Sequence, residues 1–326
     1  MKLNVLMLLF VVLISSLLGA SQGGSLSEYF YKHTCGEAET IVKKATEKHV
    51  ASNPAVPAQL LRMHFHDCFV RGCDGSVLLN SKKKNAEKDA GPNQSLLGFD
   101  VIDDIKAQVE KKCPGVVSCA DILALAARDS VSYAFKKSMW EVPTGRRDGK
   151  VSRSSEVQQN IPAPFFNFNQ LKQNFASKGL NVHDLVVLSG GHTIGVSHCN
   201  GFSNRLYNFT GKGDQDPSLD KKYAQQLKSK CPPRDRKTTV AMDPGSGSAL
   251  KFDSSYYDVV IKKKGLFTSD STLLTNNVAR NTVQKLVHQN DFFTEFALSM
   301  KKMGAIQVLT GTAGEIRKKC WAVNSN

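Results

Sequence analysis

The chain has 326 residues, of which 41% are hydrophobic and 22% are charged, and its formal net charge is +14. Length alone suggests about two domains, and the charge indicates attraction to a polyanion. No stretch interleaves aromatic and basic residues, so we expect no nucleic-acid partner and favour acidic polysaccharide. The plainer alternative is that the lysines only solvate the surface.

The N-terminus predicts a signal peptide. Met1 and Lys2 precede an apolar run from Val5 to Leu18, and small residues follow at 19–21. A charged start, a short apolar stretch and a small-residue exit are typical of secretion, whereas a membrane span needs a longer run. We predict a signal peptide over residues 1–24, cleaved at about residue 20 to 24. Residues 25–326 then form one secreted domain with no membrane partner.

The cysteines predict four disulfides. An even number of cysteines in an oxidising compartment indicates disulfide bonds, which leave no thiolate for a metal or a nucleophile. Eight cysteines allow 105 pairings, so the count does not choose among them. All eight follow the signal segment: Cys35, Cys68, Cys73, Cys113, Cys119, Cys199, Cys231 and Cys320.

The hydrophobic pattern is helical almost throughout, so we predict an all-α fold. Apolar residues within Phe293–Met303 recur at spacings of three and four, and Ser118–Val131 is apolar on nearly every side, as in a central core helix. Ordered loops and further helices are expected from turn and capping residues. The loops are Pro143–Gly149, Ile161–Pro164 and Asp243–Gly247, and the helices are Ala58–Cys68, Gly98–Cys113, Asn169–Gly179, Ser218–Cys231 and Asn277–Asn290.

The segment LRMHFHDCFVRGCDGS, residues 61–76, concentrates reactive side chains. On a helix, Arg62 and His66 share a face, while His64 points about 200° away. A lone histidine is more often a core residue, but the charge of Arg62 would lower the pKa of His66 and keep it neutral, as a general base requires. Arg62 could also stabilise charge on a substrate oxygen.

The same segment offers hard oxygen donors. Asp67, Asp74 and Ser76 stand in or beside a glycine-containing loop, which suits calcium. A Cys68–Cys73 disulfide would hold these oxygens in place. The alternative is a solvated acidic turn.

A second motif, LVVLSGGHTIG at residues 185–195, brings His192 to the end of an apolar helix. A core histidine is the plain interpretation. Asp270, in KGLFTSD, could supply the carboxylate that usually accompanies a metal-bound histidine.

Together these segments resemble the plant secretory (class III) haem peroxidases over essentially the whole mature chain. Residues 61–76 resemble the distal motif of that family, and LSGGHTIG resembles its proximal motif. Other matching segments follow in the family's order: EKDAGPN, VSCADILALAARD, VPTGRRDG, IPAPF, RLYNF and CWAVNSN. The resemblance implies a haem-peroxidase fold of two helical halves with one haem b between them.

The resemblance also implies roles around the haem. His66 would move a proton on peroxide, Arg62 would stabilise developing charge, and Phe65 would pack above the haem. Asn93 would hold the His66 ring, with Glu87 linking it towards a calcium ion.

Below the haem, the resemblance makes His192 the axial iron ligand and Asp270 its hydrogen-bonding partner. Pro162 stands where the family binds the edge of aromatic donors.

Two calcium sites and four disulfide pairings are implied as well. The distal site would use Asp67, Val70, Gly72, Asp74, Ser76 and Glu87, and the proximal site Thr193, Asp243, Ser246 and Asp253. The pairings are Cys35–Cys113, Cys68–Cys73, Cys119–Cys320 and Cys199–Cys231.

The chain departs from the family pattern in places. Gly36 replaces a proline that usually follows the first cysteine, and residues 243–253 form a loop about two residues longer than usual, which affects Ser246. Asn93 begins a glycosylation sequon but is needed inside, so Asn208 is the expected glycan site. The end of the chain lacks an apolar extension, which favours the apoplast or cell wall.

We therefore predict a secreted, monomeric peroxidase that reduces hydrogen peroxide and oxidises small phenolic donors in one-electron steps. Such chemistry serves lignin- or suberin-type metabolism, wall cross-linking and oxidative-stress responses. Two alternatives remain: a calcium-stabilised wall-binding protein with secondary or lost chemistry, and a zinc hydrolase using His64, His66 and an aspartate. Retention of Arg62, His66, His192 and Asp270 argues against the first alternative, and helix geometry and disulfide use of Cys68 argue against the second.

Overall fold

The computed structural model describes residues 25–245 and 249–325. The predicted signal peptide at residues 1–24 and the predicted calcium ligand Ser246 therefore lie outside the described residues. The described helices are α2 (Ala38–Ser52), α3 (Val56–Arg71), α4 (Phe99–Lys112), α5 (Cys119–Ser132), α6 (Ser154–Asn160), α7 (Phe168–Ala176), α8 (Val182–Ser189), α9 (Ser203–Tyr207), α10 (Lys221–Lys230), α11 (Ser255–Ile261), α12 (Thr268–Ser271), α13 (Asn277–Lys285) and α14 (Gln289–Met303).

Strand structure is minor in these ranges. Two three-residue strands, β1 (Val196–His198) and β2 (Thr239–Ala241), pair antiparallel with Val196 opposite Ala241. The prediction of an all-α fold is confirmed, although the hydrophobic pattern did not indicate this short ladder.

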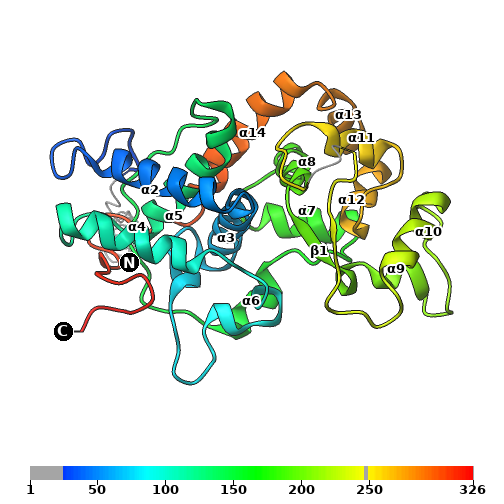
Figure 1. Ribbon diagram of the computed structural model, residues 1–326, viewed down its shortest axis with the longest axis horizontal. Coiled ribbons are helices and arrows are strands. Elements are labelled where there is room, and N and C mark those ends of the chain that lie inside the picture. The colour runs from blue at the N-terminus through cyan, green and yellow to red at the C-terminus, as the bar shows by residue number, and fades with distance from the viewer. Residues whose placement is uncertain (1–24, 246–248, 326) are drawn as a thin grey trace, which may run out of the picture.

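Helix α5 is the centre of one half of the molecule, as its apolar sequence predicted. Ser118 caps it by accepting a hydrogen bond from the Asp121 amide, and every residue of the helix is buried. Helices α2, α3 and α4 pack around it, on the left of Figure 1. This packing fixes α3, which carries the segment at residues 61–76.

The second half contains α8 to α13, on the right of Figure 1. Helix α8 packs against α7, α13 and α14. A smaller apolar cluster here surrounds the Cys199–Cys231 disulfide and includes Phe202, Leu206 and Leu227.

Most predicted helix boundaries lie within a few residues of those observed. Helix α3 is longer than predicted at both ends, and α10 starts at Lys221 because the Asp220 carboxylate caps it by accepting from the Tyr223 amide. The predicted helix Asn277–Asn290 is wrong at its end. Helix α13 stops at Lys285, and the next helix begins at Gln289.

Four disulfides join all eight cysteines, and the implied pairings are confirmed: Cys35–Cys113, Cys68–Cys73, Cys119–Cys320 and Cys199–Cys231. The Cys119–Cys320 bond ties residues 201 positions apart and fixes the end of the described chain to the start of α5. Within the described ranges, none of the helices has the length and hydropathy needed to cross a bilayer.

Candidate active site

Helix α3 places Arg62 and His66 on one face, one turn apart. The His66 ring donates from Nδ1 to Asn93 Oδ1 at 2.6 Å, and Asn93 Nδ2 donates to the Glu87 backbone oxygen at 2.9 Å. Because the amide oxygen can only accept, the neutral ring carries its proton on Nδ1. Its Nε2 is then free to take a proton.

Two effects keep His66 neutral. Burial, followed by the neighbouring Arg62 charge, lowers the pKa of His66 to about 3, while the bond to Asn93 opposes the shift. The sequence identified only the charge, which is the smaller cause.

Arg62 is held beside it by acceptors of Pro92 and Ser95. Its guanidinium donates to the Pro92 oxygen at 2.9 Å and to the Ser95 oxygen and hydroxyl, both at 3.1 Å. Burial lowers the pKa of Arg62 to about 10, so it remains a cation at neutral pH. Phe65, between them in sequence, meets the His66 ring edge-on at 5.2 Å between centroids.

His64 lies elsewhere and does not join His66. It is buried, with Nδ1 3.6 Å from the Cys68 sulfur, and burial and Arg146 lower its pKa to about 3. His64, Cys68 and Cys73 lie close enough to suggest a metal site, but both sulfurs are used by the disulfide. The zinc-hydrolase alternative needed His64, His66 and an aspartate together, and among the described residues these do not form a group that could hold a metal.

His192 lies in the turn Gly190–Thr193, which follows α8. Its Nδ1 donates to Asp270 Oδ1 at 2.8 Å. This leaves Nε2 as the free nitrogen of a side chain that is 34% exposed, whereas the Asp270 side chain is 3% exposed. A histidine fixed in this way by a carboxylate is the usual form of an iron or zinc ligand.

Asp270 has two more donors, which the sequence did not indicate. Tyr256 donates its hydroxyl to the same Oδ1 at 2.9 Å, and the Phe267 amide donates to Oδ2 at 2.8 Å. Burial alone would raise the pKa of Asp270. His192 and the hydrogen bonds outweigh burial and hold the pKa below its usual value.

The two histidine-bearing segments face each other. A Cβ placed on Gly191 would lie 3.8 Å from Leu61 Cδ2, and one on Gly195 would lie 3.2 Å from Ala58 Cβ. The first half of α3 therefore lies along residues 191–195. A free imidazole nitrogen on one segment, and a neutral histidine with a guanidinium on the other, fit the two faces of a haem.

The side chains of Asp67, Asp74, Ser76 and Glu87 form a buried group, here called the distal oxygen cluster. Asp67 accepts from the Gly75 and Val77 amides, at 2.9 and 3.3 Å, and Asp74 accepts from the Ser76 amide at 2.9 Å. The alternative of a solvated acidic turn does not hold, because each of these side chains is at most 4% exposed.

Orphaned oxygens in this cluster fit a cation. The Ser76 hydroxyl and both Glu87 carboxylate oxygens are buried without a hydrogen-bond partner among the described residues. Burial, with Asp67 next, raises the pKa of Glu87 to about 9, and burial raises that of Asp74 to about 6. A calcium ion would supply the missing positive charge. The two predicted carbonyl ligands lie next to this cluster in sequence. Val70 is in the last turn of α3, and the carbonyl of Gly72 accepts from the Asp74 amide at 2.8 Å.

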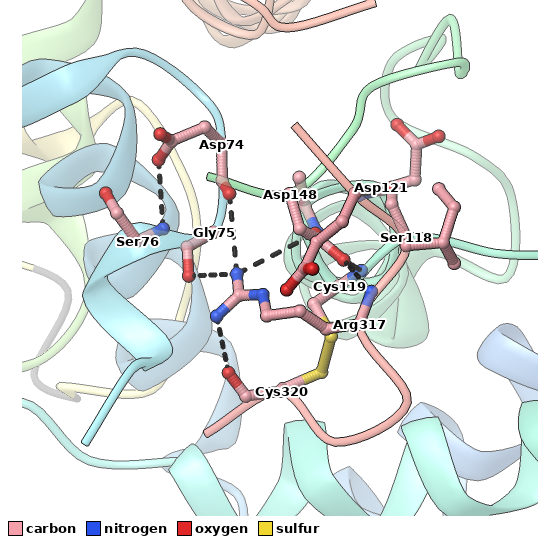
Figure 2. A network of polar contacts seen from close by, with 12 residues as sticks. Asp74, Gly75, Ser76, Ser118, Cys119, Asp121, Asp148, Arg317 and Cys320 are labelled. Atoms are coloured by element: carbon pink, nitrogen blue, oxygen red, sulfur yellow. Dashed lines mark hydrogen bonds and ion pairs between the residues drawn. A yellow bond between two sulfur atoms is a disulfide. The ribbon is translucent and has the colours of Figure 1, made fainter. Parts of the chain in front are cut away.

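Arg317 holds the loop of this cluster from below, as Figure 2 shows. Its guanidinium donates to the backbone oxygens of Gly75 at 2.5 Å, Asp74 at 3.4 Å and Cys320 at 2.6 Å. Gly75 has φ +68°, and a Cβ there would lie 2.6 Å from Arg317 Nη2, so glycine is required on both counts. The sequence contained no local indication of this long-range contact.

A second polar group, the proximal oxygen cluster, consists of Thr193, Asp243, Asp253 and Ser255. Thr193 Oγ1 lies 3.3 Å from Asp253 Oδ1 and 3.5 Å from Asp243 Oδ2, and the Ser255 hydroxyl lies within hydrogen-bond distance of a carboxylate oxygen of each aspartate. Thr193 and Asp243 are fully buried. Hydroxyl and carboxylate oxygens are donors that calcium accepts. Ser255 was not among the predicted ligands, and Lys251 already pairs with Asp253 at 2.9 Å.

The remaining predicted residues occupy separate places. Pro162 is half-buried just after α6, and the nearby Pro164 carbonyl accepts from the Ser269 amide at 3.0 Å, which joins this loop to the helix of Asp270. Asn208 is exposed, whereas Asn93 is 1% exposed and so is inaccessible to glycosylation.

Known proteins match the chain over most of its length. A family model described as Peroxidase matches residues 42–289. The chain is 54% identical to Peroxidase 3 of Arabidopsis thaliana over 300 residues, covering 91% of each, and 54% identical to Peroxidase 27 of the same plant over 318 residues, covering 97% of each. It is 51% identical to Peroxidase 1 of Oryza sativa subsp. japonica over 325 residues, covering 96% of this chain and 98% of that protein. The chain therefore belongs to the plant secretory (class III) haem peroxidase family.

Proposed function

We propose that separate residues of this peroxidase bind the haem, assist the reduction of hydrogen peroxide and contact the small phenolic donors that are oxidised. The observation that carries the proposal is the pairing of two fixed histidines on facing segments. His66 is neutral and held by Asn93 beside Arg62, and His192 is held by Asp270.

A haem held between these segments would supply the redox centre for the two oxidising equivalents of the peroxide. His192 would hold the haem iron through Nε2, and Asp270 would make the imidazole a stronger electron donor by accepting the hydrogen bond from Nδ1–H. His66 would take a proton from one peroxide oxygen and give it to the other, which leaves as water. Arg62 would stabilise the negative charge that develops on the departing oxygen.

The donor side of the proposal rests on the loop at residues 161–166. Pro162 would contact the edge of a phenolic ring, and each donor molecule would give up one electron. Such donors fit lignin- or suberin-type metabolism, wall cross-linking and oxidative-stress responses.

Calcium would be held at two places. The distal oxygen cluster, with carbonyls of Val70 and Gly72, has orphaned buried oxygens that support a cation. The proximal oxygen cluster would hold the second ion, and its support is the donor set alone.

Secretion and wall association complete the proposal. Four disulfides and the predicted signal peptide support an extracellular protein, with Asn208 as a glycan site. Residues 1–24 carry one charged side chain, Lys2, so residues 25–326 keep a net charge of about +13. At a Debye length of about 8 Å this charge acts only near a surface, so binding to de-esterified pectin should weaken steeply as salt rises.

The catalytic assignment can be tested on purified holoenzyme. His66→Ala should keep the haem absorption band but slow the reaction with hydrogen peroxide by at least about 100-fold. His192→Ala should instead change or lose that band. The exposed His33→Ala is the matched control and should change neither. An unchanged peroxide rate in His66→Ala would remove His66 from its role.

A further inference from the structure

A surface hollow lies outside every residue assigned above. It has a volume of about 420 Å³, within the range of small-ligand sites, and is here called the Trp321 hollow. Its lining comes from three separate segments: the loop after Leu79, the first turns of α4, and the residue after Cys320. The lining residues are Asn80, Lys88, Phe99, Asp103 and Trp321.

The hollow has an aromatic wall on a fixed backbone. Trp321 is 41% exposed, although a tryptophan ring usually has its large apolar faces covered. Its carbonyl accepts from the Asn80 amide at 2.9 Å, and the preceding Cys320 is bonded to Cys119. The backbone that carries the ring is therefore fixed before any ligand arrives, which reduces the entropy cost of binding.

Polar groups stand beside these rings. Lys88 Nζ donates to Asn80 Oδ1 at 2.7 Å and lies 4.3 Å from the centre of the Phe99 ring. Asp103 adds a half-buried carboxylate to the same wall. The hollow thus offers flat apolar faces, a cation and hydrogen-bond acceptors within one small space.

The two segments on either side of the hollow are rich in lysine. Lys82, Lys83 and Lys84 are exposed on the loop that also supplies Asn80 and Lys88. Lys318 and Lys319 are exposed next to Trp321, and Lys319 Nζ lies 5.1 Å from the indole centre. A phenolic donor would use the rings but not this charge, whereas an acidic sugar would use both.

We propose that the Trp321 hollow binds an acidic oligosaccharide, with one uronate ring against Trp321 and Phe99 and its carboxylate on Lys88. The C–H face of the sugar would cover the exposed indole, and Asn80 and Asp103 would accept hydrogen bonds from its hydroxyl groups. The inference rests on the proposed association with acidic polysaccharide, to which it adds one saturable site.

Calorimetric titration of the holoenzyme with trigalacturonic acid, at physiological salt, tests the site. We expect saturable binding that weakens at least about tenfold in both Trp321→Ala and Lys88→Met and is retained in Trp321→Phe. The controls are Val323→Ala, on the same terminal segment and 42% exposed, and Lys230→Met, exposed on α10. Both should bind within twofold of wild type, and every variant should keep the haem spectrum and the peroxide rate.

Other outcomes would overturn the proposal in distinguishable ways. Equal binding of maltotriose would mean that the carboxylate is not recognised, and displacement by guaiacol would make the hollow a phenol site. If wild type stays on a pectate column at low salt, but Trp321→Ala and Lys88→Met bind trigalacturonic acid normally, the hollow has no role. Binding to pectate would then be due to the net positive charge of the protein, and the proposed wall association would be retained. Loss of retention on pectate in wild type would refute that association instead.

Discussion

Asn93→Ala should slow the reaction with peroxide without removing any group that touches it. Asn93 accepts from His66 Nδ1 at 2.6 Å inside the protein, where its own side chain is 1% exposed. Truncation leaves that ring N–H buried without an acceptor, at a cost of about 1–3 kcal/mol. If the full cost falls on proton transfer, the rate constant should drop about 5- to 150-fold.

The assay is stopped-flow absorbance of the holoenzyme mixed with hydrogen peroxide. Asn93→Asp is the informative partner variant, because a carboxylate keeps the acceptor and favours the charged ring, so the pKa of His66 should rise. His66 must be neutral to take a proton. The wild-type rate should therefore be constant above pH 4 and fall as pH drops through about 3, and in Asn93→Asp that fall should begin at higher pH.

The exposed neighbour Gln94→Ala serves as control, since its side chain donates a long hydrogen bond of 3.5 Å to the Asp89 carbonyl. A peroxide rate constant for Asn93→Ala within twofold of wild type would refute the reasoning. So would an unchanged acid limb in Asn93→Asp.

Three further perturbations address other parts of the molecule. Tyr256→Phe removes one of the two hydrogen-bond donors on Asp270 Oδ1, so the hydrogen bond from His192 should strengthen. The midpoint potential of the haem iron should then fall by roughly 40 mV, the equivalent of about 1 kcal/mol. An unchanged potential, or an equal shift in the adjacent Tyr257→Phe, would contradict this. Glu87→Gln should weaken calcium binding about tenfold or more, and chelation should lower the melting temperature of wild type much more than that of the variant. Replacing both Cys119 and Cys320 by serine should destabilise the chain by about 5 kcal/mol on the loop-entropy model for 201 residues, and denaturant unfolding that differs by under 1 kcal/mol would count against that model.

The local part of the site followed from sequence because helical periodicity is short-range. Placing Arg62 and His66 on one face needed only a period of 3.6 residues. The larger cause of the low His66 pKa, burial, depends on packing of the whole half around α5 and was not visible in the pattern. The boundary between α13 and α14 was missed for a similar reason, since the apolar residues continue across it.

Contacts across long sequence distances were available only through family resemblance or not at all. Asn93 was assigned to His66 by resemblance, Asp270 was suggested for His192 from its residue type and then assigned by resemblance, and the structure brings both within hydrogen-bond distance. Tyr256 and Ser255 had no distinguishing motif, so their contacts with Asp270 and with the proximal oxygen cluster were unexpected. A hydroxyl group is common in any sequence, and only the folded chain shows where it points.

The Arg317 network has a consequence for biosynthesis. Arg317 lies 243 positions after Asp74, yet its guanidinium fixes the carbonyls of the loop that carries Asp74 and Gly75. During translation, this loop is synthesised early but cannot form its contacts with Arg317 until almost all of the chain has left the ribosome. Contacts between residues so far apart in sequence form slowly. Until they form, the partly folded half is open to chaperone binding, and Cys68 and Cys73 can form disulfides with other thiols. We therefore expect shortening the chain before Arg317 to impair secretion through misfolding of residues 67–87, far from the deletion in sequence.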